Sequence, residues 1–99
     1  MEIRVADSAK MELKEIEEYI SQDNPTKAKE VVNEIIKSFR TIQKFPNCGT
    51  LLSNKIACDN NFRYIIKYSY AIIYKLHNEY ISVNRILHLK RDFSAIDFS

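Results

Sequence analysis

Long apolar runs are absent from this sequence. No segment approaches the roughly 20 consecutive apolar residues that a membrane-spanning helix needs. The first residues, Met-Glu-Ile-Arg-Val, lack the apolar core of a signal peptide. We therefore expect the protein to stay in the cytoplasm, without contact with a membrane. Its 99 residues suffice for one domain with a single modest core, which we expect to span residues 1–99.

Cysteine and histidine are scarce as well. Cys48 and Cys58 are ten positions apart, and no histidine is close to either of them in the sequence. A structural zinc site needs about four ligands, so this pair does not predict one. The spacing permits a disulfide, but a reducing compartment disfavours it. We expect two ordinary thiols, and we find no motif for a metal ion or a small-molecule cofactor.

Glycine occurs once, at Gly49, and proline occurs twice. Gly49 ends the segment Phe45–Gly49, which closes a helical stretch and turns the chain. We expect a positive φ at Gly49, because glycine adopts that conformation readily. The segment Asp23–Pro25 marks a second break, because a residue before proline is pushed out of helical geometry. Proline itself suits the first turn of a new helix.

β-Branched and aromatic residues, in contrast, are abundant in the stretch Phe62–Asp92. This composition suits a pleated sheet. Polar breaks at Ser69 and at His77–Glu79 divide the stretch, and each break fits a tight turn between antiparallel strands. We predict a three-stranded antiparallel meander. A shorter alternation at Glu2–Val5 predicts an additional strand at the start of the chain.

Two helices are predicted between these strands. The first is expected to end at about Gln22 and to be capped by Asp7 or Ser8, either of which can accept from a backbone N–H. The second follows Pro25. Each helix carries apolar residues at helical spacing on one side, so we expect an antiparallel hairpin. These residues are Ala9, Leu13, Ile16 and Ile20 in the first helix, and Ala28, Val31, Val32, Ile35, Ile36, Phe39 and Ile42 in the second.

The apolar side of the hairpin needs a partner surface, and the meander supplies one. The predicted fold class is therefore α+β. A short N-terminal strand is followed by an antiparallel helix hairpin, which packs on one face of a C-terminal antiparallel β-meander. We expect the other face of the sheet to form a cationic hollow for a macromolecular target.

Positive charge is concentrated in the predicted sheet. Residues 1–61 carry nine Lys or Arg and ten Asp or Glu, whereas residues 62–99 carry six against three. The asymmetry points weakly to a polyanion or an acidic protein as partner. A solvated strand face is the simpler explanation of the charges taken alone.

Four motifs lie in order along nearly the whole chain. They are Phe45-Pro46-x-x-Gly49, Phe62-Arg63, Tyr68-Ser69-Tyr70-Ala71-Ile72-Ile73-Tyr74 and Arg85-Ile86-Leu87-His88-x-x-Arg91-Asp92. In order and spacing they resemble the RelE/ParE toxin superfamily, the toxin halves of bacterial type II toxin–antitoxin modules. The ending Leu-His-x-x-Arg-Asp and the long helix hairpin are more similar to the ParE branch than to the RelE branch.

The two branches of this superfamily imply different activities. ParE-like members inhibit DNA gyrase, whereas RelE-like members cleave messenger RNA on the ribosome without a metal ion. The resemblance therefore implies a growth-inhibiting toxin of plasmid-stabilization type that inhibits gyrase. The alternative is a ribosome-dependent mRNA endoribonuclease. The lysine-rich loop of the RelE branch is represented here only by Lys55, and the tyrosine near its C-terminus has no clear match.

RNA cleavage would need an acid or base and cations around the phosphate. Guanidinium groups match phosphate oxygens, and an imidazole titrates near neutral pH. The candidate catalytic residues of a nuclease are Arg63, Arg85, His88 and Arg91. The candidate residues for binding a target or nucleic acid are Arg63, Lys67, Arg85, Lys90 and Arg91. The structural alternatives are a hydrogen-bonded His88 and an ion pair between Arg85 and Asp92 or another acid.

The resemblance also implies a cognate antitoxin, which wraps the toxin with an extended or helical segment. The receiving surfaces expected here are the groove of the helix hairpin and an exposed sheet edge, which can accept an added strand. The candidate antitoxin-binding residues in the groove are Leu13, Ile16, Ile20, Val32 and Ile36. An inactive toxin that only binds its antitoxin is a third possibility.

Overall fold

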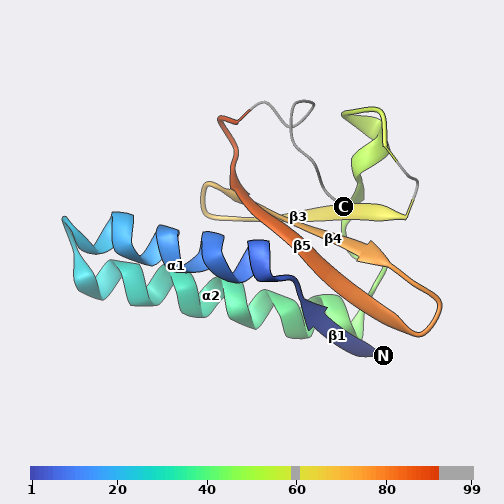
Figure 1. Ribbon diagram of the computed structural model, residues 1–99, viewed down its shortest axis with the longest axis horizontal. Coiled ribbons are helices and arrows are strands. Elements are labelled where there is room, and N and C mark those ends of the chain that lie inside the picture. The colour runs from blue at the N-terminus through green and yellow to red at the C-terminus, as the bar shows by residue number, and fades with distance from the viewer. Residues whose placement is uncertain (59–60, 92–99) are drawn as a thin grey trace.

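The computed structural model describes residues 1–58 and 61–91. They form a five-stranded sheet with two helices, which lie side by side against it (Figure 1). The elements are β1 (Glu2–Val5), α1 (Asp7–Ser21), α2 (Pro25–Lys44), β2 (Thr50–Leu51), the short 3-10 helix η1 (Leu52–Asn54), β3 (Phe62–Lys67), β4 (Tyr70–Leu76) and β5 (Tyr80–His88). The strand order is β1-β5-β4-β3-β2. The predicted α+β fold is confirmed.

The antiparallel meander of β3, β4 and β5 has its turns at the two predicted breaks. Tyr68 and Ser69 join β3 to β4, and Tyr68 has a φ of 52°, in the left-handed region that bulky residues rarely occupy. The backbone N–H of Leu89 donates to the Ser69 carbonyl at 2.9 Å, which ties the end of β5 to this turn. In the second turn, the N–H of His77 donates to the Tyr80 carbonyl at 2.9 Å.

β1 lies parallel to β5 and pairs with it only as far as Val83. Beyond that point, the start of α1 follows the edge of β5. The N–H of Ala6 donates to the Val83 carbonyl at 2.9 Å, and the Ser8 hydroxyl donates to the Asn84 carbonyl at 2.9 Å. The start of α1 therefore satisfies backbone groups that a longer β1 would otherwise pair.

The two helices begin differently. Ala6 occupies the N-cap of α1 without a side-chain cap, so the prediction that Asp7 or Ser8 caps this helix is wrong. The Ser8 side chain is directed to β5 instead, and Asp7 lies in the first turn, where its charge suits the helix dipole. α2 begins as predicted, because the Asn24 side chain caps it and Pro25 occupies its first turn.

Each face of the sheet carries an apolar cluster. The cluster between the sheet and the helices contains Ala9, Ile16, Val31, Ile35, Ile42, Ile72, Tyr74, Ile81, Val83 and Ile86. The cluster on the other face contains Leu52, Phe62, Tyr64, Ala71, Ile73 and Leu87. Within residues 1–58 and 61–91, apolar side chains and η1 therefore occupy the face where a cationic hollow was expected.

A β-bulge in β5 changes which way its residues face. The pairing of β5 with β4 skips Asn84, the extra residue of the bulge. As a result, Val83 and Ile86 both pack towards the helices, although their positions have opposite parity. Strict alternation along β5, read from the sequence, assigns these two residues to different faces.

Candidate functional site

Arg85 is bound by an acid of α1. Its Nε and one terminal nitrogen donate to the Glu12 carboxylate at 3.0 and 2.7 Å. The backbone N–H of Ile86 donates to the same carboxylate at 3.0 Å. The Arg85 and Glu12 side chains are only 19% and 13% exposed. The structure therefore contains the ion pair that was the structural alternative to a catalytic Arg85, and its acid is Glu12. Asp92, the acid named in that prediction, lies outside the described residues.

Arg63 lies at the start of β3 and binds backbone carbonyls. One terminal nitrogen donates to the Gly49 carbonyl at 2.7 Å and to the Asn47 carbonyl at 3.3 Å. Ile65, two positions further along β3, packs with the helix-side cluster. Because alternate residues of a strand share a face, Arg63 also faces the helix side. Its guanidinium holds the loop between α2 and β2.

Tyr74 completes this loop network from β4. Its hydroxyl donates to the Pro46 carbonyl at 2.8 Å and accepts from the Gly49 N–H at 2.9 Å. Burial, partly offset by the bond from Gly49, raises the pKa of Tyr74 to about 12.

Close packing, not backbone conformation, requires glycine at position 49. The expected positive φ is wrong, since Gly49 does not have one. A Cβ atom at Gly49 would lie 2.6 Å from the Tyr74 hydroxyl oxygen and 2.8 Å from the Tyr64 carbonyl oxygen. Only a residue without a side chain lets the loop approach these two atoms.

His88 and Arg91 border a cleft between α1 and the end of β5. The cleft has a volume of about 410 Å³ and is lined by Glu12, Glu15, Ile16 and Tyr19 of α1 and by Tyr70, Ile86, Leu87, His88 and Arg91. His88 Nδ1 accepts from the Lys90 N–H at 3.1 Å, so a neutral His88 ring carries its proton on Nε2. The rings of His88 and Tyr70 meet edge to face, with centroids 5.4 Å apart. Burial, and then the neighbouring Tyr19, raise the pKa of Tyr70.

The predicted cations fall into separate groups. Lys67 and His88 are both register partners of Tyr70, one on each side, so these three residues form a row across the sheet. Lys90 and Arg91 are exposed just beyond β5. Arg63 is four positions from Lys67 along β3, about 13 Å away by strand geometry. The structure thus brings His88 and Arg91 to one cleft and places Arg63 in a different network.

Tyr19 and Tyr70 were not singled out from the sequence as site residues. Tyr19 lies off the apolar side of α1, and its side chain is 72% exposed. Tyr70 falls within a superfamily motif, but only the pairing of β4 with β5 places it beside His88. A large aromatic residue off the apolar side of a predicted helix was the available signal for Tyr19. For Tyr70, the motif gave its place in the sequence but not its neighbour on β5.

The hairpin residues predicted to bind an antitoxin differ in accessibility. Ile16 is 8% exposed, and Leu13 and Ile20 pack against the same cluster. Ile36 is 45% exposed, and Val32 is partly exposed. A partner can therefore contact Ile36 and part of Val32 without opening the core, whereas Ile16 has almost no free area.

Within residues 1–58 and 61–91, no strand covers the second half of the outer edge of β3. β2 pairs only with Arg63 and Tyr64 of β3. In the part of the chain that the structure describes, no strand lies beyond Ile65–Lys67 on that side. Ile66 and Tyr68 are 52% and 45% exposed here. An open edge with exposed apolar side chains can accept an added strand.

Two features are absent from residues 1–58 and 61–91, the part of the chain that the structure describes. No group of three His, Cys, Asp or Glu side chains there is arranged to hold a metal ion. None of the helices there has the length and apolar composition to cross a membrane.

A comparison with known protein families identifies the class to which this protein belongs. Residues 3–93 match the family model described as the ParE toxin of the type II toxin-antitoxin system, parDE. The protein is thus a toxin of a type II toxin–antitoxin system, and such a toxin has a cognate antitoxin as its partner. More particularly, the chain belongs to the ParE toxin family, on the ParE branch of the RelE/ParE superfamily.

Solved structures agree with this fold. One similar chain comes from a structure described as the chromosomal ParDE TA system from P. aeruginosa, with a TM-score of 0.72 and 19% sequence identity. The alignment covers 89% of this chain and 95% of that chain. No curated protein matches the chain.

Proposed function

We propose that this toxin inhibits DNA gyrase through a protein–protein contact and not through nucleic-acid chemistry. The proposal rests on the contacts made by Arg63 and Arg85, two of the four candidate catalytic residues. Arg63 binds loop carbonyls through one terminal nitrogen and Arg85 binds Glu12, so both guanidinium groups already hold parts of the fold together. Catalysis of phosphate chemistry requires cations placed around the developing charge. A toxin that acts by binding a protein needs no such arrangement.

A supercoiling assay tests the proposal directly. Purified toxin is expected to block supercoiling of a relaxed plasmid by gyrase, and Arg63→Lys, provided that it folds, is expected to block it equally. Addition of the cognate antitoxin should restore supercoiling. Gyrase that keeps its full rate at saturating, folded toxin would overturn the proposal.

One observation favours the ribonuclease as a second candidate. The row of Lys67, Tyr70 and His88, together with Arg91 at the cleft, combines cations with an imidazole, the side chain most often used for general acid–base catalysis. Under this alternative, transcripts on translating ribosomes are cut when toxin is added, and His88→Ala abolishes the cuts. Intact transcripts with active, folded toxin would exclude it.

Neutralisation by the antitoxin fits the open edge of β3. An extended antitoxin segment that pairs with Ile65–Lys67 would cover Ile66 and Tyr68, at an edge that no strand within residues 1–58 and 61–91 covers. Such a strand would lie beside Lys67, where acidic side chains in the segment would be favourable. Both candidate targets, gyrase and the ribosome, place the action of the toxin in the cytoplasm.

A further inference from the structure

Two exposed cations lie on the last turns of α2. Arg40 and Lys44 are exposed and lie one helical turn apart. Within residues 1–58 and 61–91, neither has an ion-pair partner. Lys37, one turn earlier, differs from them, because its ammonium group lies 3.3 Å from the Glu34 carboxylate. Lys44 complements the helix dipole at this end, but that effect does not account for Arg40.

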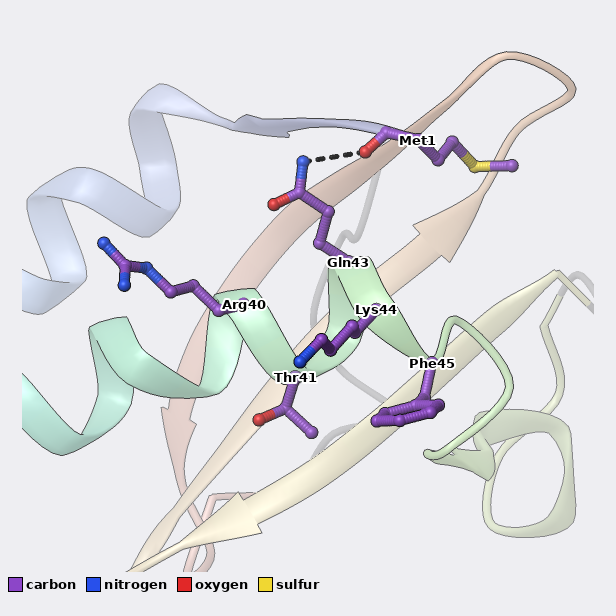
Figure 2. Close-up of a pocket in the computed structure, with 6 residues that line it drawn as sticks. All are labelled: Met1, Arg40, Thr41, Gln43, Lys44 and Phe45. Atoms are coloured by element: carbon purple, nitrogen blue, oxygen red, sulfur yellow. Dashed lines mark hydrogen bonds between the residues drawn. The ribbon is translucent and has the colours of Figure 1, made fainter.

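These cations border a hollow formed where the start of the chain meets the end of α2 (Figure 2). The hollow has a volume of about 590 Å³ and is lined by Met1, Arg40, Thr41, Gln43, Lys44 and Phe45. The Gln43 side chain donates to the Met1 carbonyl at 2.8 Å, which ties the first residue to α2. The two large apolar side chains at the hollow, Met1 and Phe45, are 56% and 61% exposed.

We propose that this hollow binds an acidic amphipathic helix of the antitoxin. Carboxylates four positions apart on such a helix lie about 6 Å apart, which matches Arg40 and Lys44. Apolar residues on the same side of the helix would cover Met1 and Phe45, the two large apolar side chains exposed at the hollow. This site is separate from the β3 edge, and it rests on the proposed neutralisation by a cognate antitoxin.

Charge reversal tests the proposal. The probe is the purified full-length cognate antitoxin, titrated calorimetrically into folded toxin. The variant Arg40→Glu/Lys44→Glu is expected to bind about tenfold more weakly at about 50 mM salt and to lose most of that difference at about 500 mM. The matched control is Lys10→Glu/Lys29→Glu, which changes the net charge equally at two exposed helix positions and should bind as the unsubstituted toxin does.

A second pair of variants isolates the apolar part of the hollow. Phe45→Ala is expected to weaken antitoxin binding several-fold, whereas Met11→Ala, which truncates a side chain that is 64% exposed on α1, should not. Melting temperatures verify that all variants fold.

The outcomes separate this inference from the proposed function. Equal antitoxin affinity for the charge-reversed variant and its control would overturn the hollow as a binding site, and the proposed neutralisation would stand. The hollow is also ruled out as an antitoxin site if charge reversal leaves antitoxin affinity unchanged and weakens only binding to a DNA duplex, or only dissociates a toxin dimer. Unsubstituted toxin that binds no antitoxin would instead overturn the proposed neutralisation.

Discussion

The cations of the sheet and those at the end of α2 are chemically alike but are used differently. Arg85 is bound by Glu12, and Arg63 is bound by two loop carbonyls. Arg40 and Lys44 have no ion-pair partner in the part of the chain that the structure describes. The role of a basic residue is therefore set by what folds against it, and not by the charge of its sequence neighbourhood. Inner cations stabilise the fold, whereas outer cations remain available to a partner.

Removal of Glu12, the acid that binds Arg85, should have the largest effect on stability. It tests whether an inner cation stabilises the fold. Glu12→Ala removes the carboxylate that accepts from the Arg85 guanidinium, whose side chain is 19% exposed, and from the Ile86 N–H. We expect a loss of about 3 kcal/mol in the free energy of unfolding, measured by urea titration. Glu17→Ala, at an exposed position of the same helix, should change stability by less than about 0.5 kcal/mol.

The double variant Glu12→Leu/Arg85→Met sharpens the test. Apolar residues of similar size remove both charges together, so much of the lost stability should return. If the double variant inhibits the target of the toxin as strongly as the unsubstituted protein does, Arg85 serves the fold and not the activity. A Glu12→Ala variant as stable as the unsubstituted protein would show that the ion pair contributes little.

The elements of the fold were predictable because local patterns determine them. Helical spacing of apolar residues and the break at Pro25 place the hairpin, and alternating β-branched residues with two polar breaks place the meander. Each of these signals lies within a few residues of the element that it predicts. The two-residue strand β2 was missed, since such a short strand forms only because β3 is there to pair with it.

The site depends on contacts between distant parts of the chain, which sequence spacing does not reveal. Glu12 and Arg85 are 73 positions apart, and no local pattern joins them. The bulge at Asn84 reverses which face of the sheet the later residues of β5 point to. Strict alternation therefore assigns those residues to the wrong face. The sequence marks Gly49 as the single glycine, but the reason for a glycine there is its close contact with Tyr74, 25 positions away, and not its own φ.

The loop held by Arg63 and Tyr74 should be the next most sensitive feature. Gly49→Ala places a methyl group 2.6 Å from the Tyr74 hydroxyl oxygen and 2.8 Å from a backbone carbonyl that cannot rotate away. We expect a loss of about 2 kcal/mol in unfolding free energy, as is usual for overpacking. Thr50→Ala, at the exposed adjacent position, should change it by less than about 0.5 kcal/mol. Equal stability of the two variants would mean that the loop shifts freely.

The smallest effect at neutral pH is expected for Tyr74→Phe. The variant loses the hydroxyl that bridges Pro46 and Gly49, which should cost about 1 kcal/mol in the free energy of unfolding. Arg63 still binds the loop carbonyls, so the fold should persist. The more informative comparison is made at alkaline pH, because only the unsubstituted protein has a titrating group at this position.

Burial raises the pKa of Tyr74 from its ordinary value of 10.0 to about 12. The folded protein therefore keeps a proton that the unfolded chain releases, so this stabilisation is complete below pH 10.0 and is lost as pH rises towards about 12. The decline amounts to roughly 2 to 3 kcal/mol over that window. Tyr74→Phe escapes this decline, so its deficit should shrink above about pH 10 and reverse near about pH 12. Urea titrations of both proteins across this range would measure the crossover, and parallel stability curves would show that the Tyr74 hydroxyl titrates normally.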